Sequence, residues 1–115
     1  MNESKNLLSG YTNMLLLKLL ESKDMYGYEM IEELAKRSDN SFSLKAGTLY
    51  PLLHSLEKDG MITSYEGNAD STRIRKYYGI TKKGKKMLEE KTTEWKTHSS
   101  KINQVLEGGA KFVAI

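Results

Sequence analysis

The sequence predicts a mainly α-helical fold with one small β-hairpin and a long C-terminal helix. Two observations indicate this class. Apolar residues recur at helical spacing before Gly60 and again after Thr81, and between these points they alternate with polar residues. A chain of 115 residues suffices for one domain with its own core.

Residues 7–20 form the first expected helix. Its apolar residues nearly encircle it, which predicts contacts on more than one side: the domain core and a partner chain. A second helix is expected over about residues 26–37, with a buried stripe of Ile31, Leu34 and Ala35. Residues 38–43 are typical of a turn that ends it.

The third helix is expected within residues 47–60. Leu49, Leu52, Leu53 and Leu56 fall on one inward stripe. Ser43 is the expected N-cap, Gly60 the left-handed residue after the helix, and Pro51 predicts a slightly irregular first turn. The residues expected to face outward are Thr48, Tyr50, Pro51, His54, Ser55 and Lys58.

Alternation after Gly60 predicts two strands, over residues 61–65 and 72–80, joined by a turn over residues 67–71. One face would carry Ile74, Tyr78 and Ile80, and the other Arg73, Arg75 and Tyr77. The hairpin therefore has a basic outward face.

Thr81 is the expected cap of a last helix that runs from about Lys82 to Leu106 and ends at Gly108 and Gly109. Gly84 would weaken its first turn by at most ~1 kcal/mol relative to Ala. A thin heptad seam follows this helix: Leu88, Thr92, Trp95, Ser99, Ile102 and Leu106. The expected units are one domain over residues 1–81, this last helix over 82–109 and a tail over 110–115.

Composition excludes several functions. The chain has no Cys, which rules out disulfides, a Cys-based zinc site and a thiol nucleophile. His54 and His98 lie on different expected helices without a neighbouring acidic motif, and the glycines form no phosphate-binding loop. We expect no enzyme, no metal site and no cofactor. The longest uncharged stretch near the N-terminus, residues 6–17, is too short and polar to cross a bilayer, so we expect a cytoplasmic protein without a membrane partner.

The net charge of +3 is unevenly distributed. All charged residues between Asp70 and Glu89 are basic. They are Arg73, Arg75, Lys76, Lys82, Lys83, Lys85 and Lys86. Such a block is either a contact for a polyanion or a solubilising surface. The four lysines at the start of a helix oppose its macrodipole, which favours a nearby anion.

The order of three helices, a basic hairpin and a further helix predicts a winged helix-turn-helix. In that arrangement the third helix enters the major groove of double-stranded DNA, and the hairpin meets the flanking phosphates. We expect a sequence-specific regulator of transcription, in which residues 1–81 form the DNA-binding domain and the helix over 82–109 forms the dimer. The alternative is a winged-helix module that docks another protein and never reads DNA.

The segments YGYEMIEELAK (residues 26–36), GTLYPLLHSLEKDGMI (47–62) and RIRKYYGITKKGKKML (73–88), with Trp95 after them, resemble the PadR family of bacterial transcriptional regulators in its short form. The resemblance implies a homodimer in which the C-terminal helices pack across the two-fold axis. It also implies a repressor on a palindromic operator, often released by a small planar aromatic or cationic inducer.

The resemblance places Tyr50 and the basic residues of the hairpin on the DNA backbone. The family usually has two adjacent arginines before KYY, whereas Ile74 separates Arg73 from Arg75 here. The expected DNA contacts are Lys45, Thr48, Tyr50, Pro51, His54, Arg73, Arg75 and Lys76. Tyr50 has a structural alternative, since its ring could cover the edge of the core.

Trp95 also has two interpretations. Its ring either packs the subunit interface, or flanks a cavity left by small polar neighbours, in which a flat aromatic ligand could stack. The expected ligand contacts are Trp95, Thr92, Ser99, Asn13, Met14 and Leu8. The expected dimer interface comprises Leu88, Trp95, Ile102, Leu106, Leu7 and Tyr11.

Overall fold

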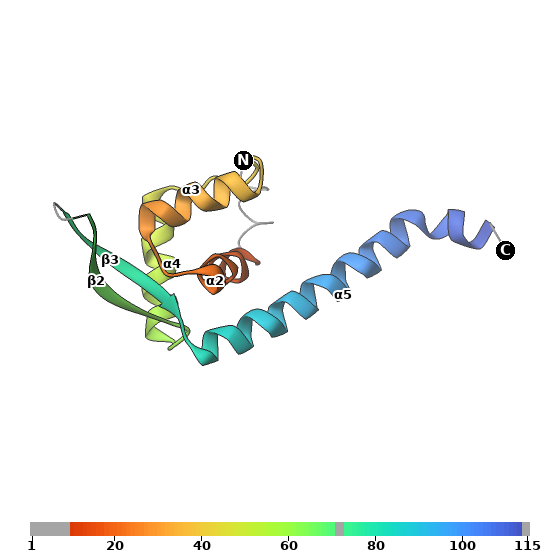
Figure 1. The fold of residues 1–115 in the computed structure, drawn as a ribbon. Helices are drawn as coiled ribbons and strands as arrows, with labels where there is room; N and C mark the ends of the chain where they lie inside the picture. Colours follow the sequence, from red (N-terminus) through yellow and green to blue (C-terminus); the bar gives the residue numbers. More distant parts are fainter. Residues whose placement is uncertain (1–9, 71–72, 114–115) are drawn as a thin grey trace.

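The computed structural model describes residues 10–70 and 73–113. Figure 1 shows a group of short helices with a β-hairpin on one side and a long helix leading away from it. The elements in chain order are α2 (Thr12–Ser22), β1 (Met25–Tyr26), α3 (Gly27–Arg37), α4 (Ala46–Lys58), β2 (Ile62–Asp70), β3 (Arg73–Ile80) and α5 (Lys82–Val113). The expected fold class is confirmed.

Helix α2 forms the centre of the core. Leu16, Leu17, Leu19 and Leu20 are all buried, because α2 contacts α3, α5 and β3 at once. The wide apolar surface expected for this helix therefore has neighbours within its own chain. The expected helix began at residue 7, and its residues 7–9 lie outside the described part.

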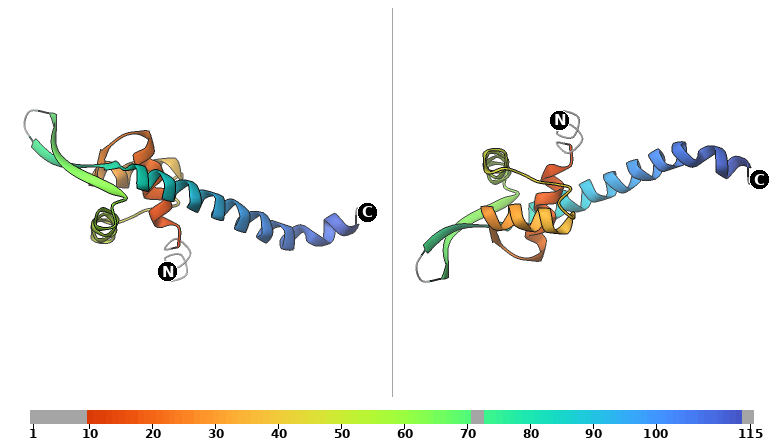
Figure 2. Two further views of the ribbon diagram at one scale, coloured as in Figure 1. Left: turned by 90° about the horizontal axis from the view of Figure 1, so that it is seen from below. Right: turned by 90° about the horizontal axis from the view of Figure 1, so that it is seen from above.

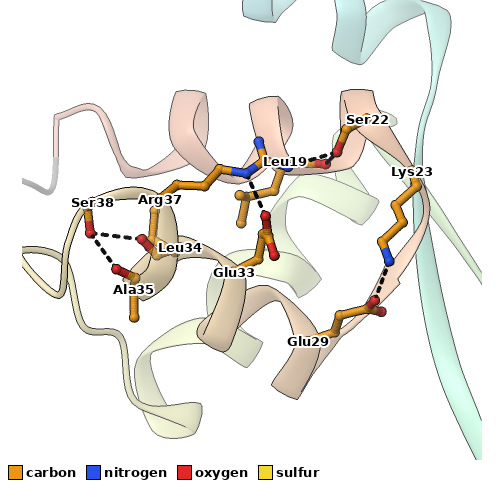
Figure 3. A network of polar contacts seen from close by, with 9 residues as sticks. All are labelled: Leu19, Ser22, Lys23, Glu29, Glu33, Leu34, Ala35, Arg37 and Ser38. Atoms are coloured by element: carbon orange, nitrogen blue, oxygen red, sulfur yellow. Dashed lines mark hydrogen bonds and ion pairs between the residues drawn. The ribbon is translucent and has the colours of Figure 1, made fainter.

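Side chains at the helix ends fix α3 against α2 (Figure 3). Arg37 donates from Nε to Glu33 Oε2 over 2.8 Å and from Nη2 to Ser22 Oγ over 3.0 Å. The hydrogen bond from Arg37 lowers the pKa of the Glu33 carboxyl. At the other end of α3, Lys23 Nζ lies 2.9 Å from Glu29 Oε2.

The inward stripes of α3 and α4 close the core. Leu49, Leu53 and Leu56 are buried as expected, and Leu52 is half-buried. Met30, which sequence periodicity missed, is fully buried in α3. The N-cap of α4 is Lys45 and not Ser43, because the helix begins later than a cap at Ser43 requires.

The hairpin belongs to a three-stranded antiparallel sheet with the order β1-β3-β2. Strand β1 was missed because two residues are too short for alternation to be visible. The turn expected over residues 67–71 is also wrong in extent: Gly67 pairs with Arg75, and pairing continues past a register shift to Asp70. Residues favourable for turns are tolerated there because the ribbon extends beyond the core.

Thr81 joins the hairpin to α5. Its hydroxyl donates to the carbonyl oxygen of Gly60 over 2.7 Å and accepts from the Gly84 N–H over 3.0 Å, which confirms the expected cap. Gly60 has a φ of +79°, as its place after α4 predicted.

Helix α5 continues to Val113, so the expected end at Gly108 and Gly109 is wrong. Among the described glycines only Gly60 has a positive φ; Gly108 and Gly109 keep helical backbone angles and do not stop the helix. In both views of Figure 2, α5 projects away from the other helices. The molecule measures 65 × 30 × 22 Å, with a radius of gyration of 17.2 Å. A compact chain of this length would have about 13 Å, so much of α5 lacks neighbours in its own chain.

Candidate nucleic-acid interface

One face of α4 is available to a ligand outside the chain. Thr48, Tyr50, Pro51 and His54 are exposed, and Lys45 is exposed at its N-cap. Each lies where the sequence placed it, because the leucine stripe fixes the rotation of the helix. The major groove of DNA admits an α-helix, and exposed polar side chains on this face could reach base edges there.

The hairpin carries its basic residues on β3. Arg73 and Lys76 are exposed, and Arg75 is half-buried. Ile74 was expected on the inward face with Tyr78, yet it is 67% exposed while Tyr78 is 4% exposed. The alternation is correct, but the strand has left the core by the time it reaches Ile74.

A groove brings α4 and the hairpin together. It measures about 690 Å³, and it is lined by Tyr26, Gly27, Tyr28, Glu32, Tyr50, Arg73, Ile74, Arg75, Lys76 and Tyr78. The predicted contacts Tyr50, Arg73, Arg75 and Lys76 thus lie in one place. Lys45, Thr48, Pro51 and His54 are not among its lining residues and occupy the remainder of the exposed α4 face.

The sequence pattern did not predict that two tyrosines at the start of α3, Tyr26 and Tyr28, line this groove. Tyr28 is 63% exposed, and Tyr26 lies in β1. Gly27 lies between them because the Tyr50 ring packs against its backbone, where a Cβ atom would collide with that ring. The sequence YGY was the available signal: a glycine between two aromatic residues indicates a close approach of another group.

Tyr50 is packed on one side and accessible on the other. Its ring covers the start of α3 at Gly27, as the structural alternative required, and the side chain is still 42% exposed. Packing on one side limits the positions that the ring can adopt. Tyr50 is therefore held at the junction of α3, α4 and the groove.

The lysines at the start of α5 differ in their surroundings. Lys82, Lys83, Lys85 and Lys86 are exposed. Lys83 Nζ donates to the carbonyl oxygen of Asp59 over 2.8 Å and so satisfies the C-terminal end of α4. This cluster lies at the base of the hairpin, and at least one of its members has a structural partner.

The region around Trp95 is partly packed. The Tyr11 and Trp95 rings meet edge to face, with centroids 4.9 Å apart, and Tyr11 Oη lies 3.3 Å from His98 Nδ1. Trp95 is 42% exposed, and Thr92 and Ser99 are half-buried. Tyr11, the N-cap residue of α2, therefore packs against part of the indole, and the rest of the Trp95 side chain is accessible.

The other residues predicted for the ligand and the dimer have different environments. Asn13 is exposed, Met14 packs against the chain's own core, and Leu7 and Leu8 lie outside the described residues. A hollow of about 480 Å³ between α2 and α5 is lined by Thr92 but not by Trp95.

The seam on α5 is shorter than expected at its start. Leu88 is 4% exposed and belongs to the core, so it is not free to contact a partner as predicted. The apolar surface of Leu88 is already buried by residues of its own chain. Ile102 and Leu106 are 54% and 76% exposed, so the apolar members of the seam are exposed from Trp95 onward.

Helices α3 and α4 with the hairpin define a winged helix-turn-helix, a class in which the third helix and the wing contact DNA. Here the third helix is α4, and the wing is the hairpin of β2 and β3. The family model for the transcriptional regulator PadR-like family matches residues 16–90. The chain belongs to this family of transcriptional regulators, whose members bind DNA. No helix in the described part of the chain has the length and apolar character needed to span a membrane.

Three similar proteins are matched over most of this chain and most of their own length. A PadR family transcription regulator of Clostridium difficile is 40% identical, with a TM-score of 0.73 over 84% of this chain and 98% of that one. A PadR-like transcriptional regulator of Bacillus cereus is 30% identical, with a TM-score of 0.80 over 89% and 97%. A protein of Lysinibacillus sphaericus, known as protein X, is 38% identical over 103 residues, 90% of this chain and 94% of that one.

Proposed function

We propose that this protein is a homodimeric transcriptional repressor that binds a palindromic operator. Each subunit would insert the exposed face of α4 into a major groove and lay its wing on the flanking backbone. The observation that carries this proposal is the shared groove, where Tyr50 of α4 lies beside Arg73, Arg75 and Lys76 of the wing. The exposed face of α4 and the basic strand of the hairpin thereby meet at Tyr50, so that one could read bases while the other binds phosphates.

The free half of α5 supports a homodimer. Ile102, Val105 and Leu106 are more than half exposed, at 54%, 81% and 76%. Apolar side chains clustered on a projecting helix favour association with a second copy. In such a dimer the two α4 helices need a separation of about 34 Å, one turn of DNA, to meet both half-sites.

A ligand response would act at the same interface. The partial exposure of Trp95 and the small side chains of Thr92 and Ser99 support a site for a planar aromatic compound beside the indole. Such a compound would reduce DNA affinity if it bound better to a subunit arrangement that does not match the operator.

The proposal is tested by binding a fluorescent duplex of random sequence while salt is varied. Counterion release predicts that affinity falls about a thousandfold or more between about 50 and 200 mM salt, if six or more phosphates are contacted. A module that docks proteins through apolar contacts would show little dependence. Selection from a random-sequence library should then return a two-fold symmetric site with half-sites about 10 base pairs apart.

Footprinting upstream of the protein's own gene tests the repressor role. Protection over the promoter, with increased transcription when the gene is deleted, is the expected result. Decreased transcription on deletion would contradict repression and would leave DNA binding intact.

A further inference from the structure

We propose that Tyr26 is a positioning residue for DNA binding, whose ring holds the Arg75 guanidinium in the groove and thereby ties the wing to the start of α3. This inference rests on the proposed function. It concerns how the wing reaches phosphate and not whether it does so.

The contact between the two side chains has the geometry of a cation–π pair. Arg75 Cζ lies 4.3 Å from the centre of the Tyr26 ring. A guanidinium that stacks on a ring keeps its N–H groups at the edge of its plane, where they can bind phosphate in bidentate fashion. Within the described ranges, Arg75 forms no ion pair that would occupy these donors.

Neighbouring rings keep Tyr26 in place. Tyr26 pairs with Tyr77 across β1 and β3, and their rings meet edge to face at 5.5 Å. Tyr77 stacks on Tyr65 at 5.8 Å, and the Tyr65 hydroxyl donates to Asp24 Oδ2 over 2.7 Å. The platform under Arg75 is therefore one end of a row of three rings across the sheet.

The same residue is joined to the helix-turn-helix. Tyr26 is the N-cap of α3, and its N–H donates to Glu29 Oε1 over 3.4 Å. The next residue, Gly27, carries the Tyr50 ring on its backbone. Arg75 therefore contacts Tyr26 and Tyr50 contacts Gly27, so that the two consecutive residues position both side chains.

This arrangement matters because β2 and β3 extend beyond the core as a two-stranded ribbon, which is flexible by itself. An arginine that is already fixed loses less conformational freedom on binding phosphate. Removing the Tyr26 ring should therefore weaken DNA binding although the charge of Arg75 remains.

The test measures anisotropy of a labelled duplex with four proteins: wild type, Tyr26→Leu, Arg75→Ala and the double variant. We expect Arg75→Ala to weaken binding about tenfold and to reduce the salt slope by about 0.9, one phosphate contact. Tyr26→Leu should weaken binding about threefold to fivefold, the range of an exposed cation–π contact, without changing the slope. The double variant should bind no more weakly than Arg75→Ala.

Matched variants separate positioning from general damage. Tyr26→Phe keeps the ring and should bind like wild type. Tyr65→Leu removes the far ring of the same row but leaves Tyr77 packed against Tyr26, so it should weaken binding less than Tyr26→Leu does. Arg75→Lys leaves all three rings in place and keeps the charge, but lacks the planar guanidinium, and should weaken binding about threefold or more.

Three results would overturn the inference while DNA binding stands: multiplicative effects of Tyr26→Leu and Arg75→Ala, wild-type affinity in Arg75→Lys, or equal losses in Tyr65→Leu and Tyr26→Leu. If Tyr26→Leu fails to fold, as judged by circular dichroism, the Arg75→Lys result decides alone. A wild-type protein that ignores duplex at low salt would overturn the proposed function and this inference with it.

Discussion

Gly84, in the first turn of α5, lies directly against the carbonyl oxygen of Met61. A Cβ atom at position 84 would collide with that oxygen and would approach Ile80 Cγ1 to 2.8 Å. The glycine therefore allows α5 to pass close to the end of the hairpin. It is a requirement of the packing and not the weak point that helix propensity suggested.

We accordingly expect Gly84→Ala to destabilise the protein by about 1 to 3 kcal/mol, the usual range for overpacking. The obstacle is backbone, which cannot rotate away. Thermal unfolding followed by circular dichroism should show a lower midpoint than wild type. Gly47→Ala is the matched control, because that helical glycine has no atom within 4 Å of its Cβ position; it should be neutral or gain at most about 1 kcal/mol. A midpoint raised equally by both variants would contradict the packing argument.

The wing can be tested by charge removal. Arg73→Ala combined with Lys76→Ala should weaken binding to all duplexes by similar factors and lower the salt slope by up to about 2, since both residues are exposed beside the groove. The control, Lys36→Ala with Lys96→Ala, removes the same charge from exposed positions outside the groove. Equal losses in the two double variants would indicate an effect of net charge and not of the wing.

The free part of α5 can be tested by one added charge. Ile102→Glu should weaken self-association at least about tenfold, because a carboxylate would be buried without a partner. Unfolding of the chain's own core should change little, since Ile102 is exposed in the single chain. Sedimentation equilibrium measures the association. Gln104→Glu adds the same charge at an exposed position on another side of the helix and should leave it unchanged; a dimer in both variants would place the interface elsewhere.

Tyr65 predicts a pH dependence of stability. The hydrogen bond to Asp24, with burial and the negative charge of Asp24, raises the pKa of the Tyr65 hydroxyl. A group whose pKa is raised by folding stabilises the protein below its unfolded pKa, which is about 10 for Tyr. That contribution is then lost as the pH rises through the folded pKa.

The comparison is between wild type and Tyr65→Phe. The variant should unfold at a lower temperature at neutral pH, and the difference should shrink above about pH 10. Burial also raises the pKa of Tyr78, but this group is present in both proteins and cancels. If the difference in unfolding temperature between the two proteins stays constant from neutral pH to above about pH 10, the Tyr65 hydroxyl does not contribute to the pH dependence of stability.

Trp95 reports on ligand binding and on its contact with Tyr11. Planar aromatic compounds that enter the subunit interface should change its fluorescence and weaken DNA binding over the same concentration range. Tyr11→Ala should shift the emission to the red by exposing the indole further. If no compound of a broad set perturbs the emission and Trp95→Ala abolishes the dimer, the residue has only a structural role.

Most of the fold could be predicted because its determinants are local. The leucine stripe of α4 fixes which side chains face outward, and the change from helical to alternating spacing after Gly60 marks the hairpin. The cap at Thr81 was visible for the same reason. Strand β1 could not be predicted, since two residues are too few to show a period. The position of Tyr26 in the groove depends on this strand and could not be predicted either.

The sequence by itself determined the order of helices and strands, the exposed face of α4 and the basic strand β3, because periodicity and charge are properties of consecutive residues. Only the tertiary structure decided that position 84 has no room for a side chain, that Leu88 belongs to the core, and that Tyr26 contacts Arg75. Each of these depends on atoms distant in sequence that folding brings within a few ångströms, and no local pattern encodes such distances.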